Sequence, residues 1–274
     1  MLDPSLAIVI VSHNVRAELE QCLSSLAAHP PARTTTIAVV DNASSDGTLE
    51  AVARQWPHVQ AIAAGGNLGF ARANNLGIAA TRSDLVLLLN PDTMVEAGQI
   101  DRLVAGLTAD RGAAAAGPRL VDAAGRPELS FGPPISPWGE FRQRRLGLAY
   151  ERGDAAAVAA VERLTRTGGA KAWVSGACLL AWRSDLEAVG RLDERYFMYT
   201  EDVDLCASLR ARGRRVLFVP EATVQHLRGR STATAPAATE RRRRESQLAF
   251  YRKHHPAWAP LLAWWLRRRG FEVR

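Results

Sequence analysis

The stretch LVLLLNPD, residues 85–92, has five aliphatic residues in a row and ends in three residues typical of turns. A short run that is apolar on both faces predicts a strand inside a sheet covered on each side. Helical patterns separate this run from the strand patterns that precede it. Those earlier patterns are LAIVIV (6–11), IAVV (37–40) and VQAIA (59–63). The alternation predicts an α/β fold with a mostly parallel sheet flanked by helices.

After residue 95 the alternation loosens, and the predicted elements become less regular. Residues 126–172 are rich in Pro, Gly and Arg and are predicted to be a variable, partly mobile excursion. The chain thus divides into two halves, 1–95 and 96–235, and a helical tail, 236–274. In the second half we predict helices around 96–110, 154–166 and 202–212, strands at 113–121 and 172–182, and two strands within 214–226 separated by a turn at Pro220.

The composition describes a folded globular protein, with 47% hydrophobic and 23% charged residues among 274. The net charge of +7 comes from the end of the chain, because residues 241–274 hold ten basic and two acidic side chains. A nearly neutral body argues against nucleic-acid binding. Three cysteines, odd in number and far apart, are predicted to be reduced thiols of a cytosolic protein. Because the sequence has neither a signal-peptide pattern nor an apolar run of about 18 residues, we expect no membrane span.

Two acids follow predicted strands of the first half directly or nearly so: Asp41 comes after IAVV and Asp92 comes two residues after LVLLL. Either one alone is equally well explained as a turn or capping residue. Together they indicate a ligand site, because ligands of open α/β sheets collect at the carboxyl ends of the strands. Asp92 would then suit Mg²⁺ or Mn²⁺, which takes few carboxylates and completes its shell with phosphate oxygens and water. His226 ends the last predicted strand and is either a structural histidine or a metal ligand, depending on whether the fold brings it to Asp92.

The segment GGNLGFARANN, residues 65–75, is rich in glycine but fits neither the dinucleotide fingerprint nor the phosphate loop. Two interpretations stay open. The segment is a flexible strand-to-helix turn, or its donors Arg72, Asn74 and Asn75 face a phosphate or a sugar.

The segment FMYTEDVDLCASLRARG, residues 197–213, places Glu201, Asp202 and Asp204 among apolar residues. A helix beginning after Thr200 would favour one or two acids in its first turn. It would not explain why aromatic residues lead directly into the acids. A carboxylate half removed from water has a raised pKa, which improves a general base.

Seven blocks of this sequence resemble glycosyltransferase family 2, and within it the bacterial rhamnosyltransferase-like members. They occur in the family's order and span about four-fifths of the chain. The blocks are VIVSHN (9–14), VVDNASSDGT (39–48), GGNLGFARANN (65–75), LLLNPD (87–92), VSGACLLAWR (174–183), RLDERYFMYTEDVDLCASLRARG (191–213) and VPEATVQH (219–226).

The resemblance implies a GT-A fold, Mg²⁺ or Mn²⁺, and a dTDP- or UDP-linked sugar donor. It implies that residues 1–95 bind the donor and that residues 96–235 bind the acceptor and carry catalysis. Asp202 matches the catalytic base of an inverting transfer, and Asp92 and His226 match metal ligands. Asp41 matches the acid that accepts a hydrogen bond from the pyrimidine. The residues that we assign on this basis to substrate or nucleotide binding are Ser12, His13, Asn14, Asp41, Asn42, Asp46, Asn67, Gly69, Arg72, Asn75, Asn90, Gly176 and Glu201.

Two departures from the family pattern affect this site. The metal motif begins with Asn90 in place of an acid, and His13 stands where many relatives carry tyrosine. We therefore expect a metal to depend more on Asp92, His226 and the donor diphosphate.

The resemblance further implies transfer of a sugar, rhamnose by similarity, to a hydroxyl of a glycan or polyprenyl-linked acceptor in cell wall or polysaccharide biosynthesis. Two rivals are a catalytically silent protein that binds a nucleotide sugar at the membrane, and a sugar nucleotidyltransferase. The intact acids argue against the first. The second usually has a Gly-rich phosphate loop near the N-terminus, which SHNVRAELEQ lacks.

The tail combines RRRR (241–244) with HHPAWAPLLAWWLRRRG (254–270). Either it is a solvated basic helix followed by a helix docked on the body, or it is an interfacial segment. In the second case the tryptophans lie at headgroup depth, Leu261, Leu262 and Leu266 lie in the lipid, and the arginines meet anionic lipid. The protein would then be peripheral on the cytoplasmic face of the inner membrane. A homodimer is left open by the sequence.

Overall fold

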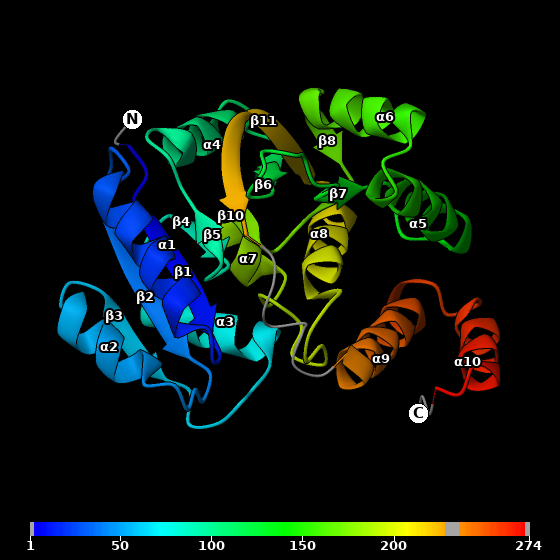
Figure 1. The fold of residues 1–274 in the computed structure, drawn as a ribbon, viewed down its shortest axis with the longest axis horizontal. Helices are drawn as coiled ribbons and strands as arrows, with labels where there is room; N and C mark the ends of the chain where they lie inside the picture. Colours follow the sequence, from blue (N-terminus) through cyan, green and yellow to red (C-terminus); the bar gives the residue numbers. More distant parts are fainter. Residues whose placement is uncertain (1–2, 228–235, 272–274) are drawn as a thin grey trace.

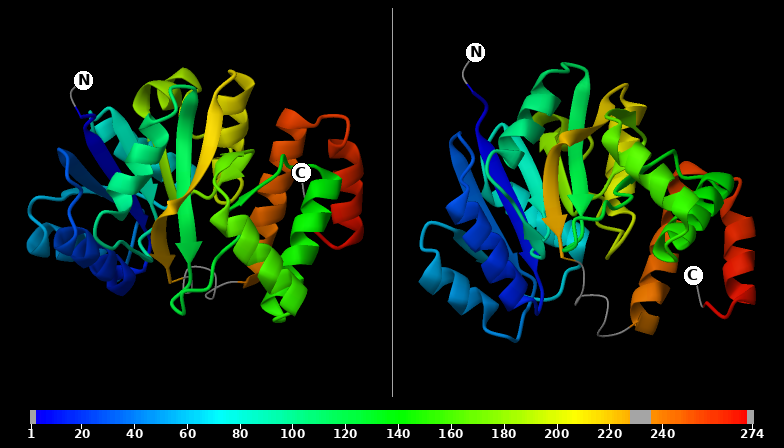
Figure 2. Two further views of the ribbon diagram at one scale, coloured as in Figure 1. Left: turned by 90° about the horizontal axis from the view of Figure 1, so that it is seen from above. Right: turned by 45° about the horizontal axis from the view of Figure 1, so that its top comes forward.

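The structure is a computed structural model that describes residues 3–227 and 236–271. A nine-stranded mixed sheet forms the centre and has helices on both faces (Figure 1). Two C-terminal helices stand beside this body (Figure 2). The predicted α/β class is confirmed.

The first half of the chain builds the parallel part of the sheet, in the order β3-β2-β1-β4. Its strands are β1 (Leu6–Ser12), β2 (Thr35–Asp41), β3 (Gln60–Ala63) and β4 (Leu85–Leu89). Its helices are α1 (Arg16–Ala28), α2 (Thr48–Gln55) and α3 (Phe70–Ala80). Ser12 pairs with Asp41 in the register of β1 and β2, so these two polar residues lie side by side at the carboxyl end of the sheet.

The second half adds strands of both directions, because β10 runs antiparallel between β4 and β6 while β6 and β11 are parallel. The strands are β5 (Thr93–Met94), β6 (Ala113–Val121), β7 (Phe131–Gly132), β8 (Gly169–Lys171), β9 (Trp173–Val174), β10 (Cys178–Trp182) and β11 (Arg215–His226). The helices are α4 (Gln99–Thr108), α5 (Pro137–Glu151), α6 (Ala155–Arg166), α7 (Arg183–Ala188), α8 (Glu201–Ala211), α9 (Pro236–His254) and α10 (Ala259–Arg268).

The alternation of side chains along β4 divides the core into two layers. Leu85, Leu87 and Leu89 face one layer, which α1 and α4 cover, whereas Val86 and Leu88 face the other, which α3, α7 and α8 cover. All five are buried, as expected for a strand with helices on both sides. The three cysteines are free and buried within these layers, and burial raises the pKa of Cys22 and Cys206 to about 12.

Four details differ from the sequence-based predictions. The expected strand at 172–182 is interrupted between β9 and β10, and β11 continues through Pro220 with a register shift where a turn was predicted. Thr200 stands at the N-cap position of α8, but its side chain does not cap the helix. Helix α5 lies inside the predicted excursion and was missed; none of its residues is buried, so it has no apolar periodicity to detect.

The tail is docked on the body, and the contact is partly ionic. Asp204 of α8 is buried and accepts hydrogen bonds from Tyr196 (3.1 Å), Lys253 (2.8 Å) and His254 (2.6 Å). A third apolar cluster joins α9 and α10 to the loop before α8. Leu266 belongs to this cluster and is fully buried, so the prediction that it lies in lipid is wrong.

Candidate active site

The carboxyl ends of β1 and β2 present two buried polar atoms without hydrogen-bond partners among the described residues, Ser12 Oγ and Asp41 Oδ1. Asp41 is 6% exposed, and its other oxygen accepts a 3.3 Å bond from the Ser44 amide. Leaving a buried carboxylate oxygen without a donor costs free energy. A ligand with a hydrogen-bond donor could therefore bind at this edge of the sheet and pair with the Asp41 carboxylate.

A polar network forms the floor beside these atoms. His13 Nδ1 lies 2.9 Å from the Asn42 carbonyl oxygen, and Asn67 Nδ2 lies 3.2 Å from His13 Nε2. Because a carbonyl only accepts, Nδ1 carries the proton and Nε2 accepts from the amide. Asn42 in turn donates to Asn67 Oδ1 at 3.1 Å and accepts from the Leu68 amide at 2.8 Å. Thus His13 is fixed in one ring orientation.

Asn14 and Asp46 shape the loop after β2. Asn14, at φ 55°, accepts a 2.7 Å bond from the Ser45 amide. Asp46 accepts from the Arg16 amide at 3.0 Å and from the Thr48 hydroxyl. Both assigned residues thus hold the backbone around the floor.

The glycine-rich segment joins the first half to the loop before α8. Phe70 donates a 2.6 Å backbone bond to the Phe197 carbonyl oxygen. The Asn75 amide is occupied in two bonds with the backbone of Leu192, at 2.9 and 3.2 Å. Arg72 is exposed, and its Nε lies 3.8 Å from Glu194. Of the donors predicted here, Arg72 has its charge at the surface, whereas the Asn75 side chain binds the backbone of the loop before α8.

Asp92 and His226 are brought together by the pairing of β5 with β11, in which His226 lies opposite Thr93. His226 Nε2 lies 3.3 Å from Asp92 Oδ1, and its Nδ1 lies 3.2 Å from Glu128 Oε2. Burial lowers the pKa of His226, but hydrogen bonds with the two carboxylates outweigh it and raise the pKa to about 9. Glu128 was missed because it lies in the predicted excursion.

The chemistry of this pair fits a divalent cation. Two adjacent ligands of an octahedral ion with bonds of about 2.1 Å lie about 3 Å apart, close to the observed 3.3 Å. Within residues 3–227 and 236–271 there is no cluster of three or more side chains able to hold a metal. The protein would supply two ligands and leave the others to phosphate oxygens and water, as Mg²⁺ often requires. Glu128 at Nδ1 would then fix the imidazole ring.

Asp202 is the second residue of α8, and the backbone of Gly176 approaches it closely. Its Oδ2 accepts a 2.8 Å bond from the Gly176 amide, and its Oδ1 accepts one from Val203. A Cβ at position 176 would lie 3.2 Å from the Asp202 Cβ, so glycine permits the contact. Burial raises the pKa of the Asp202 carboxyl, while these amide bonds act in the opposite direction. The preceding Tyr199 and Thr200 both have left-handed backbone angles, φ 70° and 73°, a strained arrangement often found at functional sites.

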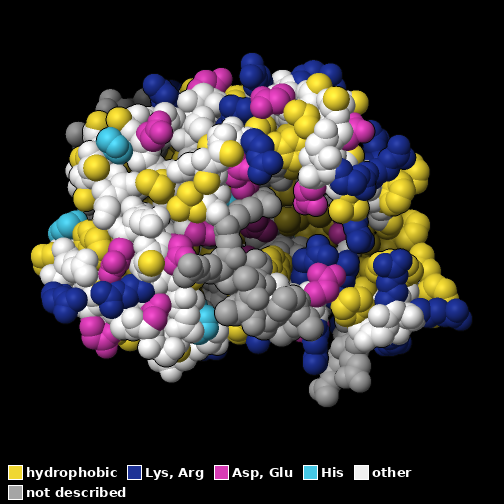
Figure 3. All heavy atoms as spheres, viewed as in Figure 1, with side chains coloured by type: hydrophobic (Ala, Val, Ile, Leu, Met, Phe, Trp, Pro, Cys, Tyr) yellow, Lys and Arg dark blue, Asp and Glu magenta, His cyan; other side chains and the backbone are white. Residues whose placement is uncertain are grey.

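Glu201 is buried, whereas its neighbour Asp202 lines a cavity. Glu201 is 6% exposed, and burial together with Asp202 raises its pKa well above the ordinary range. Asp202, in contrast, lines a cavity of about 1810 Å³ between the loop before α8 and helices α5, α9 and α10. Figure 3 shows this face hollowed at its centre, with Lys and Arg side chains along one border. Asp202 is therefore the acid of this helix start that a molecule in the cavity would meet.

Comparison with known proteins identifies the family. The sequence profile described as glycosyltransferase-like family 2 matches residues 4–259. This chain belongs to that family. It is therefore a glycosyltransferase, and a rhamnosyltransferase-like one. It is 34% identical, over 96% of its length and 89% of the relative, to N-acetylglucosaminyl-diphospho-decaprenol L-rhamnosyltransferase of Mycobacterium tuberculosis. The low-salt glycan biosynthesis hexosyltransferase Agl10 of Haloferax volcanii is 28% identical over 75% of this chain and 61% of its own.

Solved structures agree on the GT-A fold of this glycosyltransferase. A mannosyltransferase of Pyrobaculum calidifontis, in complex with GDP-Man and Mn²⁺, superposes with a TM-score of 0.64 at 18% identity, covering 96% of this chain and 69% of that one. GalNAc-T7, solved with UDP, GalNAc and Mn²⁺, gives a TM-score of 0.63 at 16% identity, with coverage of 89% and 47%. In the described part of the glycosyltransferase, none of the helices is both long and apolar enough to cross a membrane.

Proposed function

We propose that this glycosyltransferase transfers rhamnose from a dTDP- or UDP-linked donor to a hydroxyl of a polyprenyl-linked acceptor, with inversion at the anomeric carbon. The observation that carries the proposal is the presence of two separate acidic sites. Asp92 pairs with His226 at the strand ends, whereas Asp202 lines the large cavity. An inverting displacement needs its base and its leaving group on opposite faces of the sugar, so two separate acids suit it. The mycobacterial relative, named for L-rhamnose transfer to a diphospho-decaprenol acceptor, supports the sugar and the acceptor class.

In this proposal the donor base lies against the ends of β1 and β2. Asp41 Oδ1 accepts from the pyrimidine N–H, and Ser12 Oγ is the second buried atom able to pair with the ring. His13, Asn42 and Asn67 form the floor beneath it. The orphaned buried atoms support this assignment, because a pyrimidine edge offers both a donor and acceptors.

The diphosphate of the donor lies at Asp92 and His226, the residues that would hold Mg²⁺ or Mn²⁺. When bound, the cation offsets the negative charge that gathers on the departing diphosphate. Asn90, two residues before Asp92, has its backbone fixed by a 2.8 Å bond from its amide to the Ala177 carbonyl oxygen.

Asp202 acts as the general base. Its carboxylate takes the proton of the acceptor hydroxyl while the hydroxyl oxygen bonds to the anomeric carbon and the bond to the diphosphate breaks. The proton then passes to solvent. The bond from the Gly176 amide holds the carboxylate in position, and its raised pKa makes it a better proton acceptor.

The tail contributes membrane contact in this proposal. Trp258, Leu261 and Trp264 in and before α10 are about half exposed, and three arginines, Arg267, Arg268 and Arg269, follow them along the chain. The Arg268 guanidinium lies 4.9 Å from the centre of the Trp264 ring. Aromatic and basic residues together favour an anionic membrane surface. The double variant Trp264→Ser/Leu261→Ser should lose co-sedimentation with anionic vesicles, and unchanged co-sedimentation would contradict the membrane contact.

Analysis of the products tests the proposal. Donors are first selected by thermal shift with Mn²⁺ among dTDP- and UDP-sugars, because a ligand of the folded state raises its stability. The selected donor is then incubated with a polyprenyl-diphosphate glycan acceptor. Nucleoside diphosphate and a glycosylated lipid are expected. Pyrophosphate and nucleotide sugar would indicate a nucleotidyltransferase, and donor binding without turnover would indicate a silent binding protein; either result overturns the proposal.

A further inference from the structure

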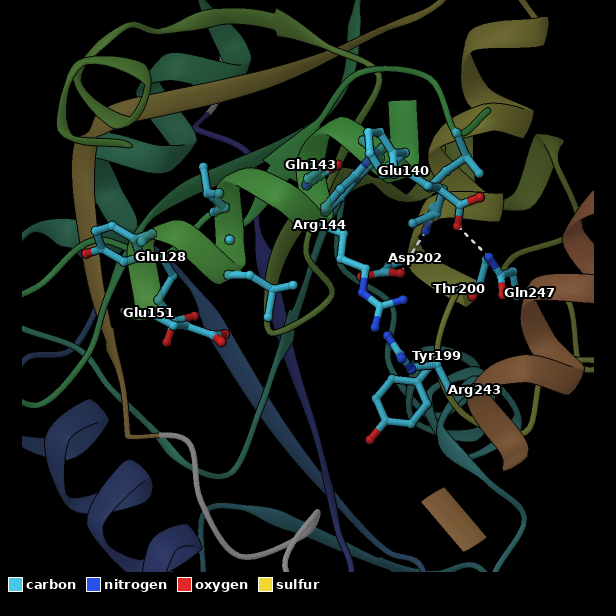
Figure 4. Close-up of a pocket in the computed structure, with 18 of the residues that line it drawn as sticks. Glu128, Glu140, Gln143, Arg144, Glu151, Tyr199, Thr200, Asp202, Arg243 and Gln247 are labelled. Carbon is cyan, nitrogen blue, oxygen red and sulfur yellow. Dashed lines mark hydrogen bonds between the residues drawn. The ribbon is translucent and has the colours of Figure 1, made fainter. Parts of the chain in front are cut away.

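Three guanidinium groups gather at the end of the cavity that Asp202 lines. Arg144 comes from α5, and Arg243 and Arg244 come from α9; all three line the cavity. In Figure 4 the side chains of Arg144 and Arg243 point toward one another beside Asp202 and Tyr199. Burial, followed by the positive charges of Arg243 and Arg144, lowers the pKa of Arg244, so like charges are close enough to repel.

The positive charge of this group is only partly compensated. Glu240 pairs with both Arg243 and Arg244 at 2.8 Å. Among the described residues, Arg144 has neither a hydrogen bond nor an ion pair, and its side chain is exposed. Within the described part of the chain, the three guanidinium groups thus have one carboxylate, that of Glu240, as an ion-pair partner, and it pairs with Arg243 and Arg244 only. Such clusters favour anions with several oxygens, because guanidinium binds phosphate in a forked, bidentate geometry.

The helices that carry these arginines are held in place by other contacts. Glu140 of α5 accepts hydrogen bonds from Gln247 and Tyr251 of α9. Arg144 lies one helical turn after Glu140, on the same face of α5. The bridge at Glu140 therefore keeps Arg144 facing Arg243. In Figure 4, Glu128 and Glu151 lie on the opposite side of the cavity from Arg144 and Arg243.

The mouth of the same cavity is apolar. Phe141 and Leu148 of α5 are 55% and 44% exposed, and Trp258, Leu261 and Trp264 around α10 are 49–54% exposed. All five line the cavity. Figures 1 and 2 agree in placing α5 and α10 on the same side of the molecule. An exposed apolar patch of this kind marks a binding site for an apolar partner.

We propose that Arg144 and Arg243 bind the diphosphate of the polyprenyl-linked acceptor, and that its isoprenoid chain leaves through the apolar mouth between α5 and α10. The inference rests on the proposed function. It assigns the acceptor site to α5, α9 and α10, and Asp202 stands where the sugar attached to that diphosphate would lie. One cavity offers a partner for each part of this ligand. The Asp202 carboxylate suits the sugar hydroxyl, the arginines suit the diphosphate, and the apolar mouth suits the isoprenoid.

Binding of farnesyl diphosphate tests the site without requiring transfer. The probe is titrated in EDTA, so that no cation draws its diphosphate to Asp92, and tryptophan fluorescence reports occupancy. Arg144→Ala/Arg243→Ala should raise the dissociation constant at least about tenfold, since the variant loses the charge-assisted hydrogen bonds of two guanidinium groups to the diphosphate. Farnesol, which lacks the diphosphate, should bind both proteins alike. The control Arg142→Ala/Arg145→Ala removes the same charge from exposed positions of α5 that do not line the cavity.

A second pair of measurements tests the apolar mouth. Leu148→Ser should weaken farnesyl diphosphate and farnesol to similar extents and leave inorganic pyrophosphate unchanged. The site is overturned if the Arg144/Arg243 variant binds farnesyl diphosphate as the wild type does, or if the Arg142/Arg145 control loses as much affinity. The site is also overturned if Arg144→Ala/Arg243→Ala loses only its binding to anionic vesicles. That result would assign the two arginines to lipid headgroups. Those results would leave sugar transfer by the wild type untouched, so failure of this site and failure of the proposed function are distinguishable.

Discussion

The Phe70 amide donates a 2.6 Å hydrogen bond to the carbonyl oxygen of Phe197. This bond joins the glycine-rich segment of the first half of the chain to the strained loop that leads into Asp202. Gly69 makes the approach possible, because a Cβ there would lie 2.3 Å from that same oxygen. The two proposed halves of the active site are therefore in direct backbone contact.

Gly69→Ala should destabilise the protein and disturb both halves together. Its φ of +81° disfavours any other residue, and the new Cβ would collide with backbone that cannot easily move. We expect the free energy of unfolding to fall by more than about 1 kcal/mol, measured by urea unfolding. The matched control is Gly66→Ala, where nothing lies within 4 Å and φ is not in the left-handed region. Equal stabilities of the two variants would contradict the close contact.

The sequence predicted the parallel half well because its strands are buried on both faces, as the LVLLL run indicates. It also indicated Asp41 and Asp92, since strand ends are visible as local patterns, whereas Asp202 was distinguished from Glu201 and Asp204 only by the resemblance to the family. Glu128 and helix α5 could not be predicted in the same way. Glu128 joins His226 from 98 residues away, and α5 buries no residue of its own. Their roles come from tertiary contacts, which leave no local periodicity.

Asp202→Asn should abolish most transfer while donor binding is retained. The amide has nearly the shape of the carboxylate but cannot take the acceptor proton, and general-base catalysis contributes about 10²–10⁴-fold. Turnover is measured by release of nucleoside diphosphate, and donor binding by thermal shift with Mn²⁺. Glu221→Gln, which changes an exposed carboxylate of β11, serves as the control and should keep its activity. Near wild-type transfer by Asp202→Asn would remove Asp202 as the base.

The pH dependence of kcat/KM should follow the ionisation of the Asp202 carboxyl. Burial raises the pKa of Asp202 above its usual 3.8. Below the raised pKa the carboxyl is protonated and cannot accept a proton, so the rate should fall tenfold per pH unit as pH decreases. The acid limb is therefore expected at higher pH than for an ordinary aspartate, and it should be absent from the residual activity of Asp202→Asn. An acid limb that persists unchanged in that variant would belong to another group.

Asp92→Asn should weaken metal binding more than any change at a neighbouring exposed acid. It replaces one of the two side chains that face each other at 3.3 Å with a neutral amide. We expect Mn²⁺ affinity to fall at least about 10–100-fold, the loss that even outer-sphere changes produce. Electron paramagnetic resonance of free Mn²⁺ measures the affinity directly, with donor nucleotide present. Glu96→Gln, an exposed acid four residues further on, is the control, and equal affinities in the two variants would argue against a metal at Asp92.

Ser246→Ala should reduce turnover by loosening the loop before Asp202. The Ser246 hydroxyl, on α9, donates a 2.8 Å hydrogen bond to the Met198 carbonyl oxygen, immediately before the two left-handed residues. Losing this bond should cost about 1 kcal/mol of stability. Because strained backbone persists only where its surroundings hold it, kcat should fall while the KM for the donor stays unchanged. Ser184→Ala, which removes a hydroxyl from an exposed position of α7, is the control. A change in stability without a change in kcat would mean that α9 supports the fold but not the position of Asp202.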